Sequence, residues 1–123
     1  QKIIQICNKK KYDTIFYHWK GDVHPDHQTG YLISEWVGKK IKNKFQFRSN
    51  FYDSNIDFKE NVYSDISKTF NLKFKAISSH RSEMKRTGGI WLKYFKHKNL
   101  GDGVKIGVKA AETFYSNKIV IDG

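Results

Sequence analysis

Short apolar runs follow one another along the chain and are separated by polar or glycine-containing stretches. Residues 13–19 (DTIFYHW) are β-branched and aromatic, which predicts a strand. Residues 70–77 (FNLKFKAI) alternate between apolar and polar side chains, and a period of two is typical of a half-buried strand. The same signals predict strands at 30–33, 45–51, 104–110 and 115–121, while 3–7 fits a strand or a helix. The pattern therefore predicts a mainly β protein.

One stretch has a helical period, and two stretches are expected to be loops. Ser34 is a suitable N-cap, and Trp36, Val37 and Ile41 follow it near helical spacing. Residues 20–29 hold Gly, Pro and several polar side chains, which predicts a loop. Residues 78–89 are polar and basic and end in two glycines, which predicts a second, longer loop.

The net charge of the chain indicates a class of ligand. The chain has 123 residues, enough for one domain over 1–123, and carries 23 Lys and Arg against 12 Asp and Glu. A net charge of +11 favours polyanionic ligands such as nucleic acids. No apolar run approaches the length of about 20 residues that a membrane span needs. The single cysteine, Cys7, excludes an internal disulfide, so we expect a cytoplasmic protein.

The two predicted loops carry side chains that suit DNA. In the second loop, Arg81 can make a bidentate contact to guanine, Glu83 can accept from cytosine, and Lys85 can neutralise a phosphate. In the first loop, His27 and Gln28 suit contacts to base edges or phosphates. We therefore expect double-stranded DNA to be the partner.

Histidines in the first loop also raise the alternative of a metal site. His24 and His27, with His18, would supply ring nitrogens. Structural zinc takes four ligands, and no paired cysteine or second cluster completes this set. The expectation from the sequence is no metal and no cofactor.

A small magnesium-dependent nuclease is a second alternative. Asp65, Glu83 and Lys85 have the acid, then acid-x-Lys, form of such a site, in which the carboxylates would hold Mg²⁺. The polar surroundings of Glu83 differ from the buried apolar strand that such sites usually occupy.

A module that binds RNA or single-stranded DNA is a third alternative. Trp19, Trp36 and Trp91 would then be stacking platforms for bases. Their place in apolar runs favours burial in a core instead.

Two motifs together resemble a known family. Residues 27–33 (HQTGYLI) resemble the His-Gln-x-Gly-aliphatic pattern, and residues 81–87 (RSEMKRT) resemble the Arg-x-Glu loop, of the B3-like DNA-recognition domain of restriction endonucleases. That fold is shared with plant B3 transcription factors. The later pattern from Trp91 to Val104, with its Gly-Asp-Gly turn, is similar to the end of the same fold.

The resemblance implies a seven-stranded open pseudobarrel with two short helices. Two arms, 20–28 and 79–87, would grip the major groove of duplex DNA and read its sequence. The chain would be the targeting module of a restriction endonuclease, with cleavage left to nuclease or NTPase domains or subunits of the parent enzyme. The implied DNA-binding residues are Lys20, Asp22, His24, His27, Gln28, Lys73, Lys75, Ser79, Arg81, Ser82, Glu83, Lys85 and Arg86.

Overall fold

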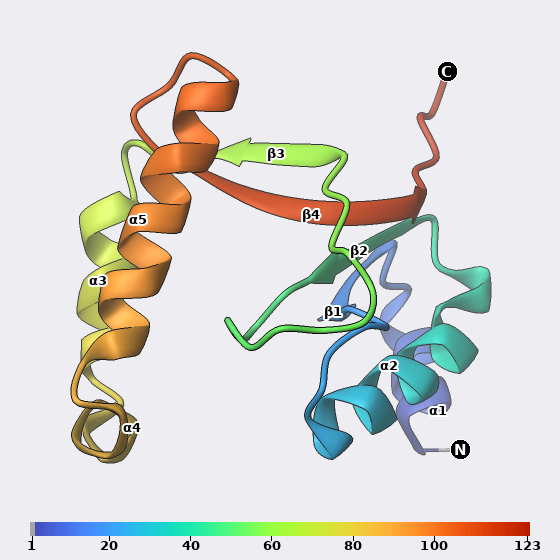
Figure 1. The fold of residues 1–123 in the computed structure, drawn as a ribbon. Helices are drawn as coiled ribbons and strands as arrows, with labels where there is room; N and C mark the ends of the chain where they lie inside the picture. Colours follow the sequence, from blue (N-terminus) through green and yellow to red (C-terminus); the bar gives the residue numbers. More distant parts are fainter. Residues whose placement is uncertain (1) are drawn as a thin grey trace. The chain divides into compact units, whose positions relative to one another are not determined.

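The computed structural model describes residues 2–123 and has an α/β architecture (Figure 1). Five helices and a short 3-10 helix occur in this range: α1 (Lys2–Lys10), α2 (Pro25–Val37), η1 (Gly38–Lys40), α3 (Phe70–Ser78), α4 (Arg81–Thr87) and α5 (Ile90–Lys105). Four strands, β1 (Thr14–His18), β2 (Asn43–Phe47), β3 (Val62–Asp65) and β4 (Ala111–Lys118), form one sheet in the order β1-β2-β4-β3. The predicted mainly β, seven-stranded pseudobarrel with two short helices is therefore wrong.

The first part of the sheet is a parallel βαβ arrangement. β1 and β2 pair in parallel from Thr14 opposite Asn43 to His18 opposite Phe47, whereas β2 and β4 pair antiparallel. Parallel neighbours need a crossover connection, and α2 with η1 supplies it. α2 packs on β1, and α1 packs on α2 (Figure 1). The carboxyl ends of β1 and β2 consequently lie at the same edge of the sheet.

α2 begins earlier than the sequence pattern predicts. His24 is its N-cap, and the His24 Nδ1 accepts the Asp26 backbone N–H at 3.2 Å. Pro25 occupies the first turn, where its missing N–H costs nothing, and the Asp26 carboxylate there complements the helix dipole. The predicted loop to residue 29, the strand at 30–33 and the helix start at Ser34 are therefore wrong.

A polar network ties α2 to the strands beneath it. The buried Tyr17 of β1 donates its hydroxyl proton to Glu35 of α2, and Lys44 of β2 pairs with the same carboxylate at 2.8 Å. Gln46, also buried, donates to the Tyr17 hydroxyl at 3.3 Å. Burial raises the pKa of Glu35, but hydrogen bonds from Lys44 and Tyr17 outweigh it and hold that pKa below its ordinary value. The ionised Glu35 thus helps to fix α2 across β1 and β2.

The chain divides into two compact units. The first unit holds the residues up to Val62 together with Phe114–Gly123, and the second holds Tyr63–Thr113. The core of the second unit contains Ile66, Phe70 and Ala110.

Helices replace most of the predicted strands and loops of the second unit. Residues 70–77 lie in α3 rather than in a strand, and the predicted loop at 78–89 contains α4. Gly88 and Gly89 both have positive φ, 59° and 76°, and separate α4 from α5. α5 also contains the Gly-Asp-Gly segment at 101–103, which was expected to be a turn, and the beginning of the strand predicted at 104–110. Within the described residues, no helix combines the length and apolar character that crossing a bilayer requires.

Candidate functional site

A cluster of polar side chains lies where the parallel strands end. His18 is the last residue of β1, His27 lies in the first turn of α2, and Asp22 lies in the loop between them. Ser49 and Asn50 follow the end of β2. In α/β sheets, the carboxyl ends of parallel strands are the usual place for ligands. All five residues belong to the first unit.

Asp22 is the centre of this cluster. Its side chain is fully buried, with 0% exposed. Oδ1 accepts the His24 backbone N–H at 2.9 Å and the Asn50 side-chain amide at 2.5 Å, and Oδ2 accepts from His27 Nδ1 at 3.0 Å and from the Ser49 hydroxyl at 3.2 Å. Burial raises the pKa of Asp22, but these hydrogen bonds outweigh it and hold the pKa below its ordinary value. Asp22 is therefore a carboxylate whose oxygens are already fully engaged.

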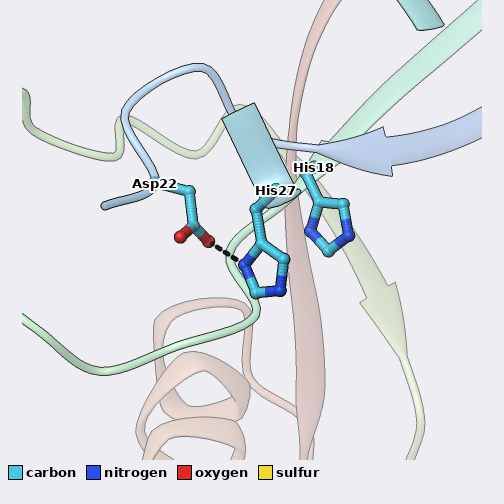
Figure 2. Close-up of side chains that lie close together, drawn as sticks. All are labelled: His18, Asp22 and His27. Atoms are coloured by element: carbon cyan, nitrogen blue, oxygen red, sulfur yellow. Dashed lines mark ion pairs between the residues drawn. The ribbon is translucent and has the colours of Figure 1, made fainter. Parts of the chain in front are cut away.

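The contact with Asp22 sets the chemistry of His27. Because Nδ1 faces the carboxylate, the ring proton sits on Nδ1, and Nε2 keeps its lone pair (Figure 2). A carboxylate behind an imidazole fixes the orientation of the ring and its tautomer. His27 is thus arranged as a metal ligand or a base at Nε2.

His18 lies face to face with His27. The two ring centroids are 4.0 Å apart and the ring planes differ by 5°. Figure 2 shows the two neighbouring rings beside Asp22. Phe47 contacts the His18 ring, with centroids 4.9 Å apart. Burial lowers the pKa of His18, and the neighbouring His27 lowers it further. The His18 ring is therefore harder to protonate than an ordinary histidine.

The cluster has the donor types of a divalent metal site. Among residues 2–123, His18, Asp22 and His27 form the one group of three or more His, Cys, Asp or Glu side chains that could share an ion, with donor atoms within 4.8 Å of one another. On zinc, with Zn–N distances of about 2.1 Å, two nitrogens lie no farther than about 4.2 Å apart. Lone pairs in near-parallel rings do not converge, so the two rings would have to turn substantially to bind one ion together. Since Asp22 is saturated with hydrogen bonds, the imidazole nitrogens are the available donors.

Comparison with solved structures identifies the fold around this cluster. The chain folds like the conserved protein TT1542 from Thermus thermophilus. The TM-score with TT1542 is 0.82 at 20% sequence identity, over 99% of this chain and 59% of TT1542. GalB, the 4-carboxy-2-hydroxymuconate hydratase from Pseudomonas putida, matches with a TM-score of 0.75 at 12% identity, again over 99% of this chain and 59% of GalB. The chain thus spans about three fifths of the length of TT1542 and of GalB. No protein-family model and no curated protein matches the sequence.

The similarity to TT1542 overturns the B3-like assignment. A fold shared with TT1542 and GalB is not the pseudobarrel of the restriction-enzyme domain, so the resemblance of the two motifs was misleading. The predicted role as a targeting module of a restriction enzyme, which reads the major groove, depended on the pseudobarrel fold. That prediction is therefore also wrong. The two loop arms that were expected to carry the DNA-binding residues, 20–28 and 79–87, instead contain the start of α2 and the whole of α4.

The residues of the expected arms occupy regular elements. In the first unit, Lys20 and Asp22 precede α2, His24 caps it, and His27 and Gln28 lie within it. The Gln28 side chain donates to the Asp22 carbonyl at 2.9 Å, which binds the start of α2 to the loop. The remaining expected residues lie in the second unit: Lys73 and Lys75 in α3, Ser79 as its C-cap, and Arg81, Ser82, Glu83, Lys85 and Arg86 in α4.

The alternative nuclease set does not form an acidic cluster in the described residues. Asp65 accepts hydrogen bonds from the backbone and hydroxyl of Ser67, and Glu83 pairs with Arg86 at 2.7 Å.

Of the tryptophans considered as stacking platforms, Trp19 is buried in the first unit, as its apolar run indicates, whereas Trp36 is 62% exposed.

Part of this cluster was predicted from the sequence, in a DNA-binding role that depended on the B3-like fold. Asp22, His24 and His27 were expected at DNA, and His18 was considered only for a metal site that was set aside. Ser49 and Asn50 were missed because a contact across about 28 residues of chain has no local signal. The available signal was the density of His and Asp between residues 18 and 27, directly after a predicted strand.

Proposed function

We propose that this chain carries part of an enzyme active site that activates water, in which His27 binds a divalent metal ion through Nε2. The observation that carries the proposal is the contact of 3.0 Å between His27 Nδ1 and the fully buried Asp22 carboxylate. A buried carboxylate that accepts the far N–H of an imidazole is the usual partner of a metal-bound histidine.

The position of the cluster supports this proposal independently. The side chains come from the carboxyl ends of two adjacent parallel strands and from the first turn of the crossover helix. A hydratase adds water to its substrate, and GalB carries that description while sharing this fold over nearly the whole chain. We therefore assign water as one reactant at the site. Activity assays are needed to identify the compound that reacts with it.

Each residue has a role in this scheme. A bound divalent ion would lower the pKa of a coordinated water toward neutrality. Asp22 holds the His27 ring in one orientation and keeps its proton on Nδ1. Asn50 and the His24 backbone N–H satisfy the other carboxylate oxygen, so that the charge stays compensated when the site is buried.

Titration of the chain with Co²⁺, followed by calorimetry and by visible absorption, tests the proposal. Nitrogen ligation gives cobalt a visible spectrum that a merely charged surface does not produce. We expect His27→Ala to weaken binding by at least about tenfold, because the ligand itself is removed. His97→Ala is the matched control, since His97 is an exposed histidine of α5 in the other unit. The proposal would be contradicted if His27→Ala and the wild-type chain bound Co²⁺ with equal affinity, or if the wild type did not bind it.

A further inference from the structure

The hydroxyl of Ser49 stands between the three members of the cluster. Its Oγ lies 3.2 Å from Asp22 Oδ2, 3.1 Å from His27 Nδ1 and 3.3 Å from His18 Nδ1. Ser49 follows β2, while the three side chains that it contacts come from β1, the next loop and α2. One half-buried hydroxyl thus connects both imidazoles to the same carboxylate.

The protons in this group can be assigned by counting donors and acceptors. A serine hydroxyl has one proton and two lone pairs. The strongest acceptor within reach is the ionised Asp22, so the Ser49 proton points to Oδ2. The lone pairs of Oγ then face the ring nitrogens. Without a proton on Nδ1, His18 would turn a lone pair of its own toward Oγ, so the contact of 3.3 Å is favourable only when His18 Nδ1 carries a proton.

We propose that Ser49 is a positioning residue that keeps the proton of His18 on Nδ1 and leaves His18 Nε2 as a second nitrogen ligand beside His27. The inference rests on the proposed function and extends it from one ligand to two. Asp22 then orients two imidazoles, His27 directly and His18 through the Ser49 hydroxyl. Because metal-bound histidines depend on the partner of their other nitrogen, the hydroxyl contributes to metal affinity without touching the ion.

The stacking of the two rings bears on where their Nε2 atoms lie. With centroids 4.0 Å apart and both Nδ1 atoms near one oxygen, the two Nε2 atoms lie on the same side of the stack (Figure 2). Because the ring planes are nearly parallel, both rings must turn well out of the stack before their lone pairs point toward a common ion.

Two-bond ¹H–¹⁵N correlation spectra of the metal-free chain at neutral pH read the tautomer of each histidine directly. We expect both His18 and His27 in the Nδ1–H form in the wild type. In Ser49→Ala, His18 should change to the Nε2–H form or to a mixture, while His27 stays because its contact with Asp22 is direct. Ser49→Thr keeps the hydroxyl and should restore the wild-type spectrum. An Nε2–H His18 in the wild type, or an unchanged His18 in Ser49→Ala, would overturn the inference.

Co²⁺ affinity gives a second readout. Loss of the partner that orients a metal-bound histidine typically costs about 10–100-fold in metal affinity, and we expect at least the lower value for Ser49→Ala and near-wild-type affinity for Ser49→Thr. If the wild type binds no metal, the proposed function fails while the tautomers still decide the positioning role of Ser49. If the wild type binds metal and Ser49→Ala matches it in tautomer and affinity, only the present inference fails.

Discussion

At the scale of single residues, Asp22 determines how the site is built. A fully buried charge is costly unless hydrogen bonds compensate it, and Asp22 receives four of them. The donors come from the loop, from α2 and from the segment after β2, so this single carboxylate links all three. The same residue therefore supports both local folding and the orientation of His27.

Replacing Asp22 tests the structural half of this role. We expect Asp22→Asn to lower the free energy of unfolding by about 3 kcal/mol, because the amide loses the charge and turns an N–H toward donors. Urea unfolding at neutral pH measures the change. Asp26→Asn is the matched control, since the Asp26 side chain is 91% exposed. We expect its effect to stay within about 0.5 kcal/mol, from the helix dipole alone. Equal destabilisation by the two substitutions would contradict the central role of Asp22.

The depressed pKa of Asp22 also predicts how stability depends on pH. A carboxyl group whose pKa is lower in the folded state contributes stability that is complete above its unfolded pKa, about 3.9, and is lost as the pH falls through the folded value. The difference in unfolding free energy between the wild type and Asp22→Asn should therefore shrink as the pH falls below about 4. Urea midpoints measured above and below that pH check this. A difference that grows on acidification would mean that the folded pKa is raised instead.

At the scale of elements, periodicity identified some segments and failed for others. The β-branched and aromatic runs at 13–19 and 45–51 contain β1 and the end of β2. Residues 70–77 fit both periods: Phe70, Phe74 and Ile77 also lie at helical spacing. The structure selects the helix, because Phe70 is buried while Leu72, which a strand would bury beside it, is 65% exposed. Short apolar runs cannot be resolved from their own period, and tertiary packing decides them.

The start of α2 shows a different kind of failure. Proline and polar residues were interpreted as a loop, although proline in a first turn and an acidic residue beside it are also typical of a helix start. Shifting that start to Pro25 moves His27 from a mobile loop to a rigid helical turn facing Asp22. Asp22 and His27 were visible in the sequence, but their chemistry depended on which element held them.

Two glycines of α5 provide a matched test of how this helix packs. A Cβ on Gly103 would lie 2.7 Å from the backbone of Ala110, whereas a Cβ on Gly101 meets nothing within 4 Å. We expect Gly103→Ala to lower the free energy of unfolding by about 2 kcal/mol or more, since backbone must move. Gly101→Ala should instead raise it by about 0.5–1 kcal/mol through helix propensity. Thermal melts followed by circular dichroism compare the two. Similar shifts for both variants would mean that α5 is not held against the segment that contains Ala110.

At the scale of the whole molecule, the proposed chemistry belongs to one of the two units. His18, Asp22, His27, Ser49 and Asn50 all lie in the first unit, while Tyr63–Thr113 has its own core around Ile66, Phe70 and Ala110. The charge of +11 belongs to the chain as a whole and led the sequence interpretation toward DNA. Net charge bears on solubility and on non-specific attraction, and it does not identify a site.

The division into units predicts which backbone amides a bound metal should protect from hydrogen exchange. A ligand stabilises those openings that disrupt its site, by about 2.7 kcal/mol at a free concentration of 100 times Kd. We therefore expect Zn²⁺ to slow amide hydrogen exchange in β1, β2 and the start of α2, and to leave the exchange of α3, α4 and α5 unchanged. His27→Ala should abolish the protection in the first unit, while His97→Ala should preserve it. Equal protection of both units would show that they open as one cooperative body, and protection of α3 to α5 alone would place the metal away from the His27 cluster.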